Sequence, residues 1–418
     1  MFWSCLLVAC CLGDVPSDEI DRFKPIYGNS AGHPWDVLHE TFYVRRFTTG
    51  ETYYHRLSFH PPWDRFSPFV QREEVFETVI HQLAAVERMP REQMEDADPI
   101  RRLIFFRDLW AVFENIWVAP VKDDAQALAR RDEIRGRLAQ IMKRLELTER
   151  EIVALPDTLS LLRAKQDFPE TFNPKDPDRP FLPTNLLDDA SDWVTFKVGK
   201  RAVIGAPRHQ DSVNQRSLFT VHLLVPKGRK TGEELLAESR KQFLRTNSVD
   251  FPTGTIRALL RRAVAASTEG KLIVTNVVES VQLIVTLGPG VLQDHRQKFV
   301  LDRSDFLAGK PGLRRLTLNT PVDAFSFEGA AFGMPFEPRY DKDGEMLVFG
   351  SGTGRRQESS LNSCFMCHGP RSRTLYANSF AGAIGGNLSD NVELARHLET
   401  TKAASDGWRE YLKLRATP

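Results

Sequence analysis

The sequence has few cysteines, no long apolar run and no excess of charge of either sign. Its five cysteines among 418 residues lack the even, dispersed pattern of a disulfide framework. No apolar stretch reaches the roughly 18–20 residues that a membrane-spanning helix needs. Lys and Arg number 56 against 55 Asp and Glu, and no basic run stands out. The charge therefore gives no support for a nucleic-acid partner.

The composition is that of a folded globular protein, with 41% hydrophobic and 10% aromatic residues. A chain of 418 residues is longer than one hydrophobic core ordinarily organises, so the length predicts two or three domains.

Three of the five cysteines lie in the first eleven residues. Residues 2–12 form an apolar run about as long as the core of a secretory signal. The run contains Leu7-Val8-Ala9-Cys10, which resembles the lipobox of bacterial lipoproteins. The resemblance implies lipid attachment at Cys10, and hence a membrane anchor. No Lys or Arg precedes the run, so an ordinary cleaved signal and a buried apolar strand remain alternatives.

From about residue 70 to residue 165 the pattern is helical. Asp98 followed by Pro99 predicts a helix start, and Thr148 with Glu151 predicts a capping box. Between these signals, apolar residues recur three and four positions apart, as on one face of a helix. The first such stripe consists of Leu103, Phe106, Trp110, Phe113 and Trp117, and the second of Ile134, Leu138, Ile141 and Leu145.

Five prolines within residues 168–192 predict either a boundary or an ordered crossing loop. Beyond them the residue types change, and Val, Ile, Leu and Thr become frequent. We expect strands at 219–225, 271–287 and 314–320, and helices at 233–244 and 255–267. The sequence therefore predicts an α+β protein, helical in its N-terminal part, with a mixed α/β or β-rich middle part.

The remaining two cysteines lie in the stretch SCFMCHGP at 363–370. Cys364, Cys367 and His368 form the pattern C-x-x-C-H, the attachment signature of c-type haem. Two thiols at this spacing add across the haem vinyl groups, and the histidine that follows turns under the ring to bind iron.

Two other chemistries use part of the same pattern. A thioredoxin-like dithiol needs a cis-proline facing the thiols some way after the motif, but Pro370 abuts it and the next proline is Pro418. A structural zinc site needs four ligands. Cys364, Cys367 and His368 supply three, and adding His397 gives a spacing that matches no zinc finger.

The motif thus resembles the attachment site of c-type cytochromes, and the resemblance extends loosely over residues 355–418. It implies one covalent haem c, with His368 as the proximal iron ligand. No methionine follows His368, so the usual downstream ligand is missing. Three alternatives remain for the sixth iron position. It could be taken by His397, which lies in a predicted helix capped by Asp390. It could instead be taken by Met334 or Met346 from upstream, or it could be open.

Together these features predict an exported bacterial c-type haem protein of the periplasm or cell envelope that transfers electrons to a redox partner. One alternative is a peroxidase-like haem enzyme or a sensor with an open iron. A second alternative is a binding or scaffold protein with a structural haem or a redox dithiol. We assign no catalytic residue. The expected domains are an export signal over 1–20, a mainly helical domain over 21–167, an α+β domain over 168–350 and a short, mostly helical haem c segment over 351–418.

Overall fold

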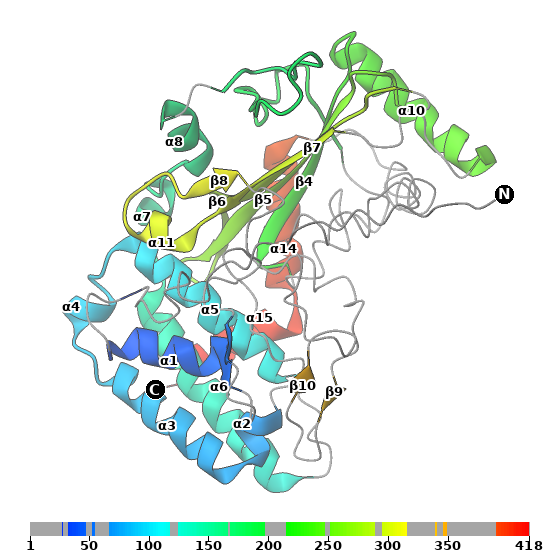
Figure 1. The fold of residues 1–418 in the computed structure, drawn as a ribbon. Helices are drawn as coiled ribbons and strands as arrows, with labels where there is room; N and C mark the ends of the chain where they lie inside the picture. Colours follow the sequence, from blue (N-terminus) through cyan, green and yellow to red (C-terminus); the bar gives the residue numbers. More distant parts are fainter. Residues whose placement is uncertain are drawn as a thin grey trace, which may run out of the picture.

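The computed structural model in Figure 1 consists of a group of helices and a six-stranded sheet. It describes residues 27, 32–46, 52–54, 67–117, 124–165, 168–196, 215–246, 251–288, 295–315, 339–340, 346–348 and 390–417. The combination of helices with an antiparallel sheet confirms the α+β class. The domain boundaries stay predictions.

The described residues between 67 and 165 are mainly helical, as predicted from about residue 70, and α5 and α6 pack against each other there. The described helices up to residue 165 are α1 (Pro34–Tyr43), α2 (Ser67–Gln71), α3 (Glu73–Glu87), α4 (Arg91–Met94), α5 (Pro99–Trp117), α6 (Ala125–Leu145), α7 (Glu149–Val153) and α8 (Thr158–Lys165). A short antiparallel pair, β1 (Val44–Arg46) with β2 (Thr52–Tyr54), follows α1.

The predicted helix signals are present. The Asp98 carboxylate accepts hydrogen bonds from the backbone N–H groups of Ile100 and Arg101 at 2.9 and 3.1 Å. Thr148 and Glu151 form a complete capping box at the start of α7. Both apolar stripes are buried over their described side chains, because α5 and α6 pack against each other within the main hydrophobic cluster.

The sheet is antiparallel throughout, in the order β3-β4-β5-β6-β7-β8. Its strands are β3 (Val194–Phe196), β4 (Ser217–Leu224), β5 (Ile256–Ala266), β6 (Leu272–Val285), β7 (His295–Leu301) and β8 (Leu313–Arg315). The strands predicted at 219–225 and 271–287 are confirmed as β4 and β6. Of the strand predicted at 314–320, the first two residues lie in β8, and the rest lie outside the described residues.

The remaining described elements are α10 (Arg229–Thr246), α11 (Arg303–Leu307), the pair β9 (Arg339–Tyr340) with β10 (Met346–Val348), α14 (Asn391–Ala403) and α15 (Asp406–Ala416). α10 confirms the helix predicted at 233–244. α14 confirms the predicted helix after Asp390, whose carboxylate accepts from the Glu393 N–H at 2.6 Å.

The prediction of a helix at 255–267 is wrong, because these residues form β5. Ile256, Ala258 and Leu260 point to one face of the sheet, and Arg257 and Arg261 point to the other. The Leu, Ala and Arg content favours a helix. Hydrogen bonding to β4 on one side and β6 on the other overrides that preference.

The two faces of the sheet differ in composition. The first, which we call the core face, carries Leu218, Leu260, Leu283 and Phe299, and these residues belong to the main hydrophobic cluster. The opposite side, which we call the second face, carries Phe219, Val221, Arg261, Gln282 and Lys298. A smaller apolar cluster lies on the second face, where α10 packs on β3 and β4.

The proline-rich stretch is an ordered loop that covers the core face at β7. Phe181 and Leu182 are buried. The Phe168 ring packs edge-on against Phe299 with 5.5 Å between centroids, and Phe181 exchanges backbone hydrogen bonds with the Gln297 amide. The main hydrophobic cluster extends from Tyr27 to Tyr411, so the helices, the sheet and the last two helices share it.

Candidate functional site

Most of the residues that the sequence singles out lie outside the described residues. These are Cys10, Met334, Cys364, Cys367 and His368. Met346 begins β10, and His397 lies on α14. Among the predicted iron ligands, the structure therefore describes the side chain of His397 alone.

His397 lies on a helix that several contacts hold on the core face. Leu394 and Leu398 are buried in the main cluster. Glu399 accepts a hydrogen bond from the Val274 N–H at 2.8 Å. At the start of the helix, the Asn391 side-chain amide donates to the Asp189 carboxylate at 2.9 Å. The side chain of His397 is half-buried and makes no hydrogen bond or ion pair to another described residue.

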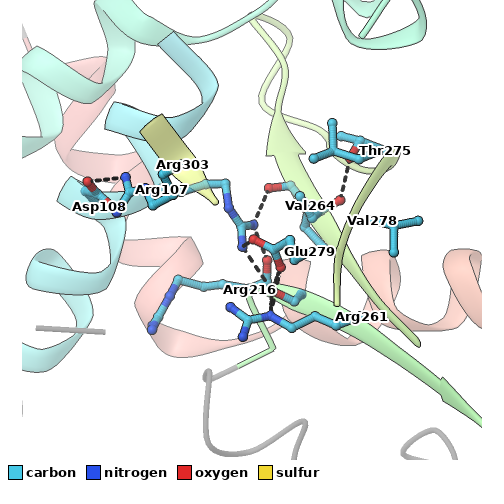
Figure 2. Close-up of polar contacts among 12 residues, drawn as sticks. Arg107, Asp108, Arg216, Arg261, Val264, Thr275, Val278, Glu279 and Arg303 are labelled. Atoms are coloured by element: carbon cyan, nitrogen blue, oxygen red, sulfur yellow. Dashed lines mark hydrogen bonds and ion pairs between the residues drawn. The ribbon is translucent and has the colours of Figure 1, made fainter. Parts of the chain in front are cut away.

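A buried polar network joins α5 to the sheet at the level of Arg107 (Figure 2). Arg107 Nη2 lies 2.6 Å from Glu279 Oε1 on β6, and Arg107 Nη1 donates to the backbone carbonyls of Arg216 and Val264. The other oxygen of Glu279 accepts from Arg261 Nε at 2.8 Å and from Ser217 Oγ at 2.6 Å. Glu279 therefore receives donors from α5, β4 and β5 at one point.

Burial and these contacts together shift the pKa values of Arg107 and Glu279. Burial lowers the pKa of Arg107 to about 10, although the Glu279 carboxylate opposes this effect. Burial alone would raise the pKa of Glu279, but the Arg107 and Arg261 guanidinium groups hold it below its usual range. Arg107, Arg261 and Glu279 thus form a cluster of charged side chains within the protein interior.

Two turns after Arg107 on α5, Glu114 links the sheet to α14. Glu114 Oε2 lies 2.7 Å from Arg216 Nη1, and Glu114 Oε1 accepts from the Trp110 indole at 3.0 Å and from the Lys402 ammonium. Lys402 also lies over the Trp110 ring, 5.3 Å from its centroid. Burial lowers the pKa of Lys402, and Glu114 opposes this shift. The ion pair holds the last turn of α14 on α5.

Asp108 forms a third buried cluster with α1 and α11. Its carboxylate lies 2.5 Å from Arg303 Nη2 and 3.0 Å from His39 Nε2, and it accepts from the Tyr27 hydroxyl. Burial would raise the pKa of Asp108, but Arg303 and His39 lower it below its usual range. The Tyr43 hydroxyl donates to the Asp108 backbone carbonyl at 3.0 Å.

Sequence reasoning missed these three clusters, and α5 is common to all of them. Arg107, Asp108 and Glu114 each pair with a different element, so α5 fixes α1, α11, the sheet and α14 relative to one another. Each carboxylate accepts several hydrogen bonds, which suits it to holding elements in place. The available signal was the presence of charged residues inside a strongly apolar helix, because charges in such positions are buried only when paired.

The described residues give no other site of recognisable chemistry. Among them, no three His, Cys, Asp or Glu side chains are grouped as a metal site would require. Within the same part of the chain, no helix has the length and apolar character to span a bilayer.

Glu146, which follows α6, joins the end of that helix to α15. Its carboxylate accepts from the Tyr411 hydroxyl at 2.7 Å and lies 2.9 Å from Arg415 Nη1, and its side chain is 1% exposed. Burial raises the pKa of Glu146 to about 7, while Tyr411, Arg415 and Lys143 oppose the shift.

We expect the free energy of unfolding to decrease as the pH rises from about 4.5 to about 7. In this window the unfolded chain has released the Glu146 proton and the folded chain retains it, so stability falls by roughly 3 kcal/mol. The loss is complete above the folded pKa. Urea unfolding between pH 4.5 and 8 measures it.

In Glu146→Gln, which retains an acceptor for Tyr411, this part of the pH dependence should disappear. Glu149→Gln is the matched control, because the Glu149 carboxylate pairs with Lys271 at the surface, 2.7 Å away. An unchanged pH dependence in Glu146→Gln would show that Glu146 titrates normally.

Comparison of the chain with protein-family models, curated proteins and solved structures finds no match.

Proposed function

We propose that this chain is an exported c-type haem protein that transfers electrons. Cys364 and Cys367 would hold one haem covalently, and His368 would bind its iron as the proximal ligand. The observation that carries the proposal is the C-x-x-C-H pattern in the sequence, in which each residue type has a required role. A lipid at Cys10 would hold the protein at the cell envelope.

The surroundings of His397 support its assignment as the sixth iron ligand. The half-buried imidazole has no hydrogen-bond or ion-pair partner among the described residues, so a ring nitrogen is available for a metal. α14 is fixed at both ends, by Asp189 at its start and by Glu114 at its last turn. A fixed ligand helix limits the rearrangement that accompanies a change of charge on the iron.

Electron transfer follows from this ligand set. A bound haem c supplies a ferrous–ferric couple. With His368 and His397 both coordinated, the iron would have no open position for a substrate. The partner would then be a redox protein that approaches the haem edge.

The proposal predicts covalent haem in the full chain after export in a host with c-haem maturation machinery. A denaturing gel stained for haem should show a band of the chain's own mass, and Cys364→Ser/Cys367→Ser should abolish it. The reduced visible spectrum should be low-spin. A haem-free band despite good export would overturn the proposal and return both cysteines to thiol or metal chemistry.

The assignment of His397 is tested separately. His397→Ala should convert the spectrum to high-spin, while His81→Ala, which removes an exposed histidine of α3, should leave it unchanged. If His397→Ala keeps the low-spin spectrum of the parent, another residue is the sixth ligand, and Met334 is the next to be replaced. A high-spin parent would favour the alternative of an open, reactive iron.

A further inference from the structure

The aromatic side chains where α15 meets α5 form a continuous buried chain. Trp110 lies 5.2 Å from Trp408, and Trp408 lies 4.9 Å from Tyr411, both measured between ring centroids. All three rings are fully buried. Rings at these separations are in van der Waals contact, so an electron can pass readily from one to the next. Indole and phenol rings are among the side chains that lose one electron most easily.

Tyr411 ends this chain with a hydrogen bond to a buried carboxylate. Its hydroxyl donates to Glu146 Oε1 at 2.7 Å. A phenol becomes a strong acid when it loses an electron, so it is oxidised readily only where a base can take its proton. The distance to Glu146 suits direct proton transfer. Burial raises the pKa of Glu146 to about 7, so this carboxylate binds a proton more tightly than an ordinary glutamate.

The charged groups around Glu146 leave it able to accept that proton. Arg415 of α15 lies 2.9 Å from its carboxylate, and Lys143 of α6 adds a second positive charge. Arg102 of α5 donates to the Glu146 backbone carbonyl. These cations favour the ionised carboxylate but do not outweigh its burial, so Glu146 loses its proton near pH 7. Above this pH the carboxylate is ionised and can receive the Tyr411 proton.

The two indoles have no comparable acceptor. The Trp110 N–H donates to Glu114 at 3.0 Å, but Glu114 is also paired with Arg216 and Lys402, so taking up a proton would weaken two buried ion pairs. The Lys402 ammonium lies over the Trp110 ring, 5.3 Å from its centroid, where it opposes a positive charge on that ring. The Trp408 N–H has no hydrogen-bond partner among the described residues. A missing electron on either indole is therefore most stable after transfer to the tyrosine.

A second buried pair of a tyrosine and a carboxylate differs in this respect. The Tyr27 hydroxyl donates to Asp108, and the Tyr27 ring lies 5.9 Å from the Trp35 ring. Burial would raise the pKa of Asp108, but Arg303 and His39 hold it below its usual range. A carboxylate that binds protons weakly is a poor acceptor for a phenol proton. The affinity of the acceptor for a proton thus distinguishes this pair from the one on α15.

We propose that Trp110, Trp408 and Tyr411 form a one-electron relay that ends in a neutral radical on Tyr411. A metal complex in a high oxidation state takes one electron from an indole and is reduced by one unit. The indole regains its electron from Tyr411. The Tyr411 O–H bond breaks in the same step, and the proton forms a new O–H bond with Glu146. These steps use described residues alone and do not depend on haem, so the core holds an oxidising equivalent separately from any iron.

Photo-oxidation of the full chain tests the relay. Light and a cobalt(III) quencher convert tris(bipyridine)ruthenium(II) to ruthenium(III), which accepts one electron from the protein. The sample is kept above pH 7, where Glu146 is ionised. It is frozen after a delay in which exposed tyrosyl radicals couple to one another, and it is then measured by EPR. We expect a persistent tyrosyl signal, which should narrow when the chain carries ring-deuterated tyrosine.

Four variants assign the signal. Tyr411→Phe should abolish it, and Tyr27→Phe, the matched control with a carboxylate of low pKa, should leave it unchanged. Glu146→Gln keeps the phenol but removes the base, so the yield of radical should fall at least about tenfold. Trp408→Phe keeps a ring in the core but replaces the indole with one that is not oxidised, so the yield should fall here too.

The pH dependence of the parent gives a reading that needs no variant. As Glu146 takes up its proton between about pH 8 and about pH 6, the yield should fall about tenfold. A yield independent of pH would contradict the role of Glu146. The absence of a persistent tyrosyl signal in the parent, its survival in Tyr411→Phe, or its loss in Tyr27→Phe would each overturn the relay.

Discussion

Replacing Glu279 by alanine is expected to lower the free energy of unfolding by about 3–5 kcal/mol, because two buried guanidinium groups lose their counter-charge. Arg107 and Arg261 both lie within 3 Å of this carboxylate, at 2.6 and 2.8 Å, and its side chain is 1% exposed. Ser217 also loses its acceptor. Urea denaturation of the purified variant measures the loss.

The effect should come from burial and not from the loss of a carboxylate as such. Glu149→Ala is the matched control, because Glu149 makes an equally short contact to Lys271 at the surface. Exposed pairs contribute about 0–1 kcal/mol, so this variant should remain close to the parent. Equal losses in the two variants would contradict the view that Glu279 holds α5 on the sheet.

A double-mutant cycle separates the Arg107 contact from the others. Arg107→Met alone also removes the hydrogen bonds to the carbonyls of Arg216 and Val264. Combined with Glu279→Ala, it should cost less than the sum of the two single changes, because the second substitution no longer leaves Arg107 unpaired. The size of this difference reports the coupling between α5 and β6.

The sequence predicted those features that depend on local pattern. The capping box at Thr148 and the apolar stripes of α5 and α6 are confirmed, because a helix start and a helix face are set by residues a few positions apart. The strands β4 and β6 are confirmed for the same reason. β5 was missed because pairing with two distant strands decided its conformation.

The buried charges could not be predicted from local pattern. Arg107 and Glu279 are 172 positions apart, and their pairing depends on how α5 meets the sheet. The C-x-x-C-H pattern is the reverse case, because its residues are adjacent in the sequence and the haem proposal can be made from them without the fold.

The second large effect is expected for Trp408→Ala in α15, with a loss of about 3–5 kcal/mol in the free energy of unfolding. Trp408 is fully buried. Its ring packs on Trp110 of α5 at 5.2 Å and on Tyr411 at 4.9 Å between centroids. Removing it leaves a cavity where α15 meets α5. Thermal or urea unfolding measures the loss.

Trp408→Phe is the conservative variant, because it keeps an aromatic ring against Trp110 and should lose clearly less stability than alanine. Arg409→Ala, at the exposed neighbouring position, should lose little. A small loss in Trp408→Ala would show that α15 is not part of the main core.

If the proposed haem ligation holds, Trp408→Ala should also weaken the low-spin spectrum. α14 and α15 are in contact, so loosening α15 releases the helix that positions His397.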